Sequence, residues 1–368
     1  MIQKIKNYFH LLQAVLANVY YGFPSRRLKV IGITGTDGKT TTTTLVYHIL
    51  KNSGRSASMI STIYADIAGK KYDIGFHVTT PDSFMIQKFL KLSADNHDEF
   101  FVLETTSHAI DQNRIWGINY TIGAITNITH EHLDYHKTFE EYKKTKLRLA
   151  NMAEIGILNS NKKEKILENI PNLTEFNKKN YSVAYRICRN LGLSNDEIIS
   201  AMNTFVLPKG RLETVYDKDF KIIIDFAHTP NAFLELLPAI KDQYLKKTGR
   251  LIHVFGAAGL RDRSKRPLMG DASNKYSDKI ILTEEDFRTE DLQEICRAIS
   301  RKIDKNKYEI IINRTEAIKK AISIAKKDDV VVITGKGHEK SLCRGQREYP
   351  YSEHEAVKNG LAELKLIN

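Results

Sequence analysis

The chain has little cysteine and no long apolar run. Its 368 residues include three cysteines, Cys188, Cys296 and Cys343, whose spacing matches neither a disulfide framework nor a metal-binding motif. That usage is typical of a reducing compartment, so we expect a cytoplasmic protein. No run of about 18 apolar residues is present, and a membrane-spanning helix is therefore not expected. A signal peptide is not expected either, because no small-residue cleavage site follows an apolar core.

The sequence also lacks solenoid-type repeats, low-complexity tracts and any motif for nucleic-acid binding. The formal net charge of +12 would suit a nucleic acid, but anionic small substrates such as nucleotides explain it equally well. Because the lysines are scattered rather than gathered in one stripe, we expect small-molecule substrates and no nucleic acid. With 42% hydrophobic and 27% charged residues the chain is globular, and its length predicts two or three domains.

The first segment, residues 2–23, predicts an amphipathic helix that carries lysines. Its apolar residues recur at helical spacing and include Ile5, Phe9, Leu12 and Leu16. The interpretation we favour is packing against the neighbouring domain. Contact with a membrane surface is the alternative, because basic amphipathic helices also bind there.

Apolar strands alternate with helix-like stretches over most of the chain. Strands are predicted at 29–34, 58–62, 99–104, 122–127 and 155–159, and again at 220–225, 250–255, 279–283, 309–312 and 330–334. This alternation predicts two α/β domains with mostly parallel sheets, the second Rossmann-like. A break at residues 207–210 separates them. We expect an N-terminal helix and linker over 1–29, a central domain over 30–207 and a C-terminal domain over 208–368.

A phosphate-binding loop follows the first of these strands. Gly35, Gly38 and Lys39 lie between the strand and a helix-like segment, with the hydroxyl of Thr40 directly after the lysine. Glycines let backbone N–H groups face phosphate oxygens, the lysine reaches the outer phosphates, and the hydroxyl suits Mg²⁺. The usual first glycine of the motif is replaced by Ile33, so the loop is a variant. It predicts binding of ATP or GTP.

Polar residues follow two further strands. Glu104 ends an apolar strand, where a magnesium ligand beside a phosphate loop should stand. Residues 129–136 contain three histidines and two carboxylates. They could form a metal site, although their spacing differs from that of helical zinc motifs.

The motifs together resemble the Mur ligases, and most closely their UDP-N-acetylmuramoyl-tripeptide synthetase (MurE-type) branch. The matching stretches are residues 79–81, 104–108, 111–114, 127–136 with Tyr142 and Lys146, 210–213, 225–230, 261–270 and 334–339. The resemblance implies an ATP-dependent ligase that phosphorylates a substrate carboxylate and lets an amino group attack the acyl phosphate. The implied product is a diamino acid amide-linked to UDP-N-acetylmuramoyl-L-Ala-D-Glu, a peptidoglycan precursor. ATP and Mg²⁺ are the implied cofactors.

The resemblance also implies roles for individual residues. The residues implied to bind the phosphates are Gly35, Thr36, Gly38, Lys39, Thr40 and Thr41. The implied Mg²⁺ ligands are Thr40, Glu104, His132 and Lys146, the last of them carbamylated. Further nucleotide contacts are implied for Asn177, Asn180, Arg211, Asp225 and His228. The residues implied to contact the muramoyl peptide are Thr79, Thr80, Thr106, Gln112 and Arg114. Lys39, His132, Lys146 and Arg211 form the implied catalytic set.

Selection of the incoming amino acid is implied for Arg261, Asp286, Arg288, Gly335 and Glu339. Diaminopimelate-adding relatives carry Asp-Asn-Pro-Arg where this chain has residues 285–288, Glu-Asp-Phe-Arg. Because the arginine is kept, we favour diaminopimelate over lysine.

Two departures from the family leave alternatives open. Only residues 1–29 precede the phosphate-loop strand where relatives carry a uridine-binding domain, and residues 159–176 form a shortened segment. The acceptor could be bound without strong uridine contacts, through a partner protein, or not be UDP-linked. A ligase for another carboxylate, such as a polyglutamate chain, and an inactive ATP-binding homologue are the remaining hypotheses.

Overall fold

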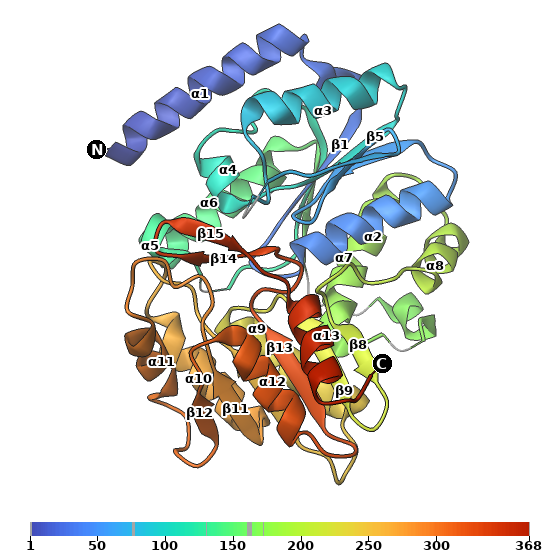
Figure 1. The fold of residues 1–368 in the computed structure, drawn as a ribbon. Helices are drawn as coiled ribbons and strands as arrows, with labels where there is room; N and C mark the ends of the chain where they lie inside the picture. Colours follow the sequence, from blue (N-terminus) through green and yellow to red (C-terminus); the bar gives the residue numbers. More distant parts are fainter. Residues whose placement is uncertain (1, 76–77, 130, 160–163, 172, 368) are drawn as a thin grey trace. The chain divides into compact units, whose positions relative to one another are not determined.

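A computed structural model describes residues 2–75, 78–129, 131–159, 164–171 and 173–367. The chain divides into two compact units, Met1–Val206 and Leu207–Asn368. Each unit is an α/β domain built on a largely parallel sheet, as the alternating pattern predicts (Figure 1). The boundary between the units lies at the break that the sequence shows at residues 207–210.

The first unit contains a seven-stranded sheet. Its order is β4 (Lys70–Tyr72), β3 (Ala65–Ile67), β2 (Ala57–Ile60), β5 (Phe100–Glu104), β1 (Lys29–Thr34), β6 (Tyr120–Ile125) and β7 (Ile155–Leu158). Neighbouring strands pair in parallel along β2, β5, β1, β6 and β7. β3 pairs antiparallel with β2 on one side and with β4 on the other. The sequence did not predict β3 and β4, because strands of three residues are too short to show a period of two.

Helices cover both faces of this sheet. One face packs on α2 (Lys39–Asn52), α7 (Glu175–Asn190) and α8 (Asn195–Asn203), and the other on α3 (Ser83–Asp95), α4 (Ser107–Asp111) and α6 (Phe139–Met152). Alternation along β1 explains the two cores, since Ile31 and Ile33 join the first and Val30 the second. Two short pieces, α5 (Leu133–His136) and η2 (Lys165–Asn169), complete the unit.

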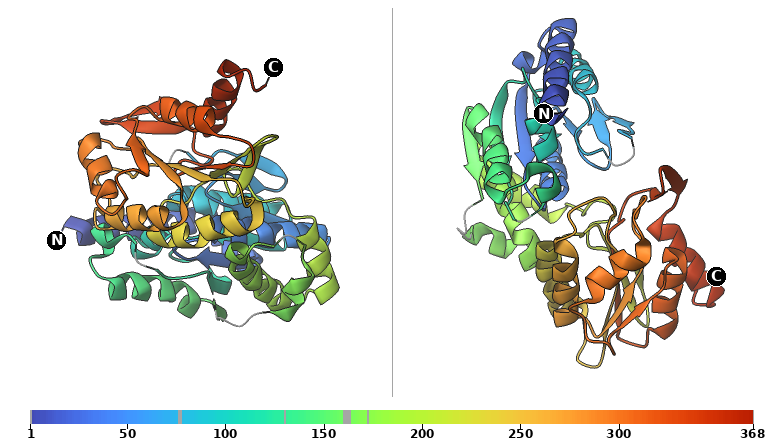
Figure 2. Two further views of the ribbon diagram at one scale, coloured as in Figure 1. Left: turned by 90° about the horizontal axis from the view of Figure 1, so that it is seen from below. Right: turned by 90° about the vertical axis from the view of Figure 1, so that its left-hand side faces the viewer.

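The N-terminal segment forms α1 (Ile2–Tyr21), which is followed by a short η1 (Pro24–Arg27). It lies along α3, and both views agree on this placement (Figure 1; Figure 2). The buried amide of Asn18 donates to the carbonyl oxygen of Trp116 at 2.8 Å. Among the described residues, no helix is long and apolar enough to cross a membrane.

The second unit contains a six-stranded sheet. Its order is β12 (Tyr308–Ile310), β11 (Lys279–Leu282), β10 (Leu251–Phe255), β13 (Val330–Thr334), β9 (Lys221–Asp225) and β8 (Glu213–Asp217), with β8 alone antiparallel. One face packs on α9 (Pro230–Tyr244), α10 (Lys265–Tyr276) and α11 (Leu292–Ser300), the other on α12 (Arg314–Ile324) and α13 (Glu353–Glu363). A hairpin of β14 (Ser341–Arg344) and β15 (Arg347–Pro350) stands apart from the sheet. The sequence predicted the parallel strands but not β8, the hairpin or α13.

Candidate active site

The phosphate loop lies between the end of β1 and the start of α2. Gly38 has a φ of 78°, and a Cβ there would lie 1.9 Å from Oδ1 of Asn180. Only glycine fits both the backbone and the space. Asn180 and Asn177 are buried on α7, and their side chains are hydrogen-bonded to each other at 3.2 Å. The two asparagines named from the sequence therefore stand beside the phosphate loop.

The side chains of Lys39 and Asn127 brace the loop from two sides. The ammonium of Lys39 donates to the carbonyl oxygens of Gly35 at 3.0 Å and Thr36 at 2.8 Å. Asn127, directly beyond β6, accepts the backbone N–H groups of Thr36 at 3.0 Å and Asp37 at 2.8 Å through its Oδ1. Sequence reasoning quoted Asn127 within a motif but gave it no role. Its position after the strand that pairs with β1 is the signal that could have found it.

Glu104 is fully buried at the carboxyl end of β5 and collects three donors. Its Oε1 accepts the hydroxyls of Thr40 at 2.9 Å and Thr62 at 2.8 Å, and its Oε2 accepts the backbone N–H of Thr62 at 2.7 Å. The predicted pair of Thr40 and Glu104 is thus brought together. These oxygens are the kind of ligand that Mg²⁺ prefers. Thr62, which follows β2, was missed, and its signal is the neighbouring position of β2 and β5 in the sheet.

Lys146 is buried on α6, with 1% of its surface exposed. Its Nζ donates to the carbonyl oxygen of Gly35 at 2.6 Å and lies 4.6 Å from the centre of the Tyr142 ring. Burial lowers the pKa of Lys146 well below its usual range, the nearby charge of Lys39 lowers it further, and Glu131 only partly opposes this. The fold therefore favours an uncharged amine at this position.

His132 lies on the loop that follows β6, with a φ of 55°. Its Nε2 is 3.7 Å from Oε2 of Glu131, and its ring stands 5.0 Å from that of His108. Within the part of the chain that the structure describes, no group of three or more His, Cys, Asp or Glu side chains is arranged to hold a metal. His130 of the same cluster lies outside the described residues. The structure brings Thr40 and Glu104 together, but binding of a metal by any of the four predicted residues stays a prediction.

The residues predicted to bind the acceptor peptide form a hydrogen-bonded series next to Glu104. Thr79 meets Thr62 at 3.2 Å, and the hydroxyl of Thr80 donates to the backbone carbonyl of Glu104 at 3.0 Å. The backbone N–H of Thr106 donates in turn to the Thr80 hydroxyl at 2.9 Å. These contacts place the predicted acceptor side of the site beside its predicted metal side.

Arg114, which follows α4 along the chain, is the last member of this series. Its Nη1 donates to the carbonyl oxygen of Thr80 at 2.6 Å, whereas its buried Nε lacks an acceptor among the described residues. Burial lowers the pKa of Arg114 from its ordinary value. Gln112 caps the end of α4, where its backbone N–H donates to the carbonyl of His108 at 2.8 Å. A guanidinium with an unused donor can receive a carboxylate.

The second unit begins with Gly210 and Arg211. Gly210 has a φ of 71°, and a Cβ there would lie 2.4 Å from the backbone nitrogen of His338. The Arg211 guanidinium stacks 4.5 Å from the centre of the Phe226 ring. Close packing thus fixes the position from which Arg211 projects.

Asp225 is buried at the carboxyl end of β9. Its carboxylate accepts the backbone N–H groups of Leu212 and Ala227, each at 2.7 Å. Burial raises its pKa, while the charge of Arg211 and these two hydrogen bonds act in the opposite direction. His228 follows, and its Nδ1 lies 2.8 Å from the carbonyl oxygen of Phe226. Asp225 therefore joins the start of the unit to the loop that carries His228.

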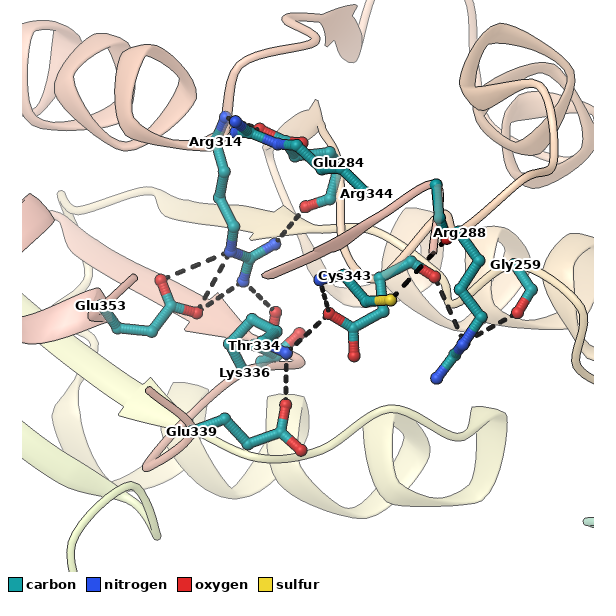
Figure 3. Close-up of polar contacts among 12 residues, drawn as sticks. Gly259, Glu284, Arg288, Arg314, Thr334, Lys336, Glu339, Cys343, Arg344 and Glu353 are labelled. Carbon is teal, nitrogen blue, oxygen red and sulfur yellow. Dashed lines mark hydrogen bonds and ion pairs between the residues drawn. The ribbon is translucent and has the colours of Figure 1, made fainter. Parts of the chain in front are cut away.

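A cluster of charged residues gathers beyond β11 and β13 (Figure 3). The ammonium of Lys336, fully buried, lies 2.8 Å from Oδ1 of Asp286 and also pairs with Glu339. Burial alone would lower the pKa of Lys336, but the two carboxylates outweigh it and raise the pKa. Asp286 further accepts the backbone N–H of Cys343 at 2.9 Å. Sequence reasoning gave Lys336 no role. Its partner Asp286 lies 50 residues away along the chain, so no local pattern links the two residues.

Arg288 is held by the β14–β15 hairpin. Its backbone N–H donates to the carbonyl of Cys343 at 3.1 Å, and the N–H of Gly345 donates back to its carbonyl at 2.7 Å. Its Nη1 reaches the carbonyl of Gly259 at 2.8 Å (Figure 3). Gly335, with a φ of 113°, stands where a Cβ would lie 2.8 Å from Oε2 of Glu285. Four of the five predicted amino-acid-binding residues thus lie around β11, β13 and the hairpin, whereas Arg261 is exposed on the loop before α10.

Two family descriptions match this chain. Residues 33–208 match the Mur ligase middle domain, and residues 210–337 match the domain described as Mur ligase, glutamate ligase domain. A relative from Clostridium acetobutylicum, named UDP-N-acetylmuramoyl-L-alanyl-D-glutamate--2,6-diaminopimelate ligase 1, is 35% identical, and the match covers 95% of this chain and 82% of the relative. The chain belongs to the Mur ligase family.

Other Mur ligase relatives support this placement. A protein of Aquifex aeolicus named as a UDP-N-acetylmuramoyl-L-alanyl-D-glutamate--2,6-diaminopimelate ligase is 38% identical, with 93% of this chain and 79% of the relative covered. A solved structure named for the same activity superposes with a TM-score of 0.56 at 25% identity, over 92% of this chain and 79% of the other. Folylpolyglutamate synthase from Mycobacterium tuberculosis gives a TM-score of 0.72 at 16% identity, covering 97% and 95%, which shows a shared fold alone.

Proposed function

We propose that this Mur ligase adds a diamino acid, meso-diaminopimelate, to UDP-N-acetylmuramoyl-L-Ala-D-Glu with hydrolysis of ATP. The relatives from Clostridium acetobutylicum and Aquifex aeolicus are named for this reaction. The observation that carries the proposal is the buried Lys146 amine, which donates to the carbonyl oxygen of Gly35 at 2.6 Å and so stands at the phosphate loop, where the family resemblance implies a carbamate. ATP as the nucleotide is supported by related structures that hold ADP.

The reaction consists of two displacements. A carboxylate oxygen of the acceptor attacks the γ-phosphorus of ATP, which forms the acyl phosphate and releases ADP. The uncharged amino group of the incoming amino acid then attacks the acyl carbon, phosphate leaves, and the nitrogen loses a proton to give the amide. Both steps depend on positioning and on stabilisation of negative charge. In this account Lys39 and the loop N–H groups bind the phosphates, and Arg114 orients the acceptor carboxylate.

The oxygen ligands at Glu104 fit a magnesium ion. The hydroxyl of Thr40 and the carboxylate of Glu104 converge at 2.9 Å beside the N-terminus of α2. A bound Mg²⁺ would screen the repulsion between the γ-phosphate and the acceptor carboxylate. We assign Thr40 and Glu104 to this ion, with His132 and Lys146 as the proposed further ligands.

Carbamylation would turn Lys146 from a cation into an anion. The uncharged amine attacks carbon dioxide, an N–C bond forms, and one proton is lost to solvent. The lowered pKa of Lys146 favours the reactive amine, and the product carbamate would no longer repel Lys39. The fold thus supports the modification that the family resemblance implies.

For the second unit, we propose that Arg211, Asp225 and His228 contribute to nucleotide binding. Arg288 is assigned to the distal carboxylate of the diamino acid, together with Arg261. Because Glu339 already pairs with Lys336, the substrate's distal ammonium would share that carboxylate rather than occupy it alone. Asn177 and Asn180, next to Gly38, are assigned to the nucleotide as well.

The test is to identify the product by mass spectrometry. Purified protein is incubated with Mg·ATP, UDP-N-acetylmuramoyl-L-Ala-D-Glu and an equimolar mixture of meso-diaminopimelate, lysine and ornithine, with Lys39→Ala as the control variant. The proposal predicts the diaminopimelate tripeptide as the main product. A lysine product would overturn the amino-acid assignment, and the absence of any tripeptide would favour a different carboxylate substrate.

A further inference from the structure

An exposed apolar row runs along the whole of α1. It consists of Ile5, Tyr8, Phe9, Leu12, Leu16, Val19 and Tyr20, which we call the α1 stripe. The exposed fractions of these seven side chains run from 51% to 76%. Their spacing of three and four residues puts them on one face of the helix. A surface helix normally turns such a face toward the core, so this orientation is inverted.

Polar side chains hold the helix in this orientation. The amide of Asn7 donates to the carbonyl oxygen of Asp111 at 3.1 Å and to its Oδ2 at 2.9 Å. Asn18, fully buried, donates to the carbonyl of Trp116 at 2.8 Å. The apolar row therefore faces solvent because the opposite side of α1 is anchored by specific hydrogen bonds to the domain.

The surroundings of the α1 stripe are basic. Residues 1–36 contain five lysines and arginines and no aspartate or glutamate. Of these, Lys6, Arg26, Arg27 and Lys29 are exposed, and two form ion pairs, Arg27 with Asp95 at 2.8 Å and Lys29 with Glu99 at 2.9 Å. The adjacent helix α3 adds exposed Phe84 and Leu92, with the exposed Lys88 between them in sequence. An apolar face bordered by cations is complementary to a surface that is apolar in depth and anionic on top.

We propose that the α1 stripe binds the surface of an anionic membrane, with α1 lying in the plane of the interface. Tyr8, Phe9 and Tyr20 suit this depth, because aromatic side chains favour the boundary between headgroups and acyl chains. A second copy of the chain fits less well, since pairing of two such faces would bring together two N-terminal segments that carry lysines and arginines and no acidic residue of their own. The helix is not long and apolar enough to span the bilayer.

The test is flotation of the full chain with lipid vesicles. Vesicles of phosphatidylglycerol and phosphatidylcholine in equal parts are compared with pure phosphatidylcholine, at low and at high salt. The variant Leu12→Gln/Leu16→Gln removes apolar surface without changing charge, and Leu234→Gln/Leu268→Gln is its control, because these leucines are similarly exposed on α9 and α10. Circular dichroism and thermal unfolding confirm that both variants fold.

We expect wild type and control to float with the anionic vesicles, and the α1 variant to bind at least about tenfold more weakly. High salt should weaken wild-type binding, because the basic residues contribute. Equal binding of wild type and the α1 variant would overturn the proposal, since the net charge alone would then explain attachment. Absence of wild-type binding would overturn it too, and if ultracentrifugation then shows a dimer that Leu12→Gln/Leu16→Gln dissociates, the stripe is a contact between copies.

Discussion

Lys39 and Lys146 donate hydrogen bonds to one acceptor, the carbonyl oxygen of Gly35, at 3.0 and 2.6 Å. Two ammonium groups at such a distance from the same atom repel each other, and one of them is buried. Burial is the main cause of the lowered pKa of Lys146, and the charge of Lys39 lowers this pKa further. This relationship supports the assignment of Lys39 to phosphate and of Lys146 to a modified, anionic role.

The first prediction concerns Lys146. Lys146→Ala should abolish ligase turnover, because no anion then replaces the proposed carbamate. Acetate or bicarbonate should restore part of the activity by occupying the vacated space. Steady-state ADP release measures both effects, with Lys143→Ala, an exposed lysine on the same helix, as the control that keeps wild-type activity. Normal turnover by Lys146→Ala would refute the assigned role.

The second prediction concerns Gly38. Gly38→Ala should prevent ATP binding, since the new Cβ would meet Oδ1 of Asn180 and the backbone has a φ of 78°. Gly54→Ala is the matched control, with a φ of 73° and no atom within 4 Å of its Cβ position. We expect the control to lose about 1 kcal/mol of stability and to bind ATP normally. Isothermal titration calorimetry measures the affinity of each variant for ATP. Equal affinities of Gly38→Ala and Gly54→Ala would contradict the proposal that Gly38 is needed for its close approach to Asn180.

The third prediction concerns selection of the amino acid. Arg288→Ala should raise the KM for meso-diaminopimelate by roughly a hundredfold, because a charged hydrogen bond to the distal carboxylate is lost. The KM for ATP should change little. Arg297→Ala, an exposed arginine on α11, serves as the control. If the KM values for both substrates rose together in Arg288→Ala, the arginine would be a structural residue and not a reader of the amino acid.

The fourth prediction concerns pH and stability. His253 is buried on β10 between Ser273 and Thr334, and burial lowers its pKa to about 3. The unfolded chain binds a proton near pH 6.5, whereas the folded chain does not until about pH 3. Stability from this group is therefore present above pH 6.5 and lost as the pH falls, by up to about 1.4 kcal/mol per pH unit.

Urea unfolding of wild type and His253→Gln at pH 7 and pH 5 tests this linkage. The difference in free energy of unfolding between the two proteins should shrink at pH 5. A difference that stays constant over this range would show that His253 does not titrate as its burial implies.

Much of the fold could be predicted from the sequence because long parallel strands carry continuous apolar runs. β13 lies where the pattern placed it, at residues 330–334, and β1 likewise at 29–34. The three-residue strands β3 and β4 and the hairpin of β14 and β15 could not be predicted, since short or exposed strands lack a clear apolar signal.

The site was predictable where motifs are local and unpredictable where contacts are not. The phosphate loop and its lysine are contiguous in sequence, whereas Thr62 reaches Glu104 only because β2 pairs with β5. The partnership of Lys336 and Asp286 likewise arises from two loops that tertiary packing brings together. The sequence also did not predict which face of α1 packs on the domain. Its apolar periodicity does not reveal that Asn7 and Asn18 anchor the inward face through hydrogen bonds.

The most direct test of the proposed ligase is amino-acid-dependent ADP release with Mg·ATP and UDP-N-acetylmuramoyl-L-Ala-D-Glu. Wild type and Lys39→Ala are assayed in parallel with and without meso-diaminopimelate. The account predicts that wild type releases ADP over many turnovers only when the acceptor and the amino acid are both present, and that Lys39→Ala releases none. Wild-type protein that binds ATP but releases no ADP under these conditions would contradict it.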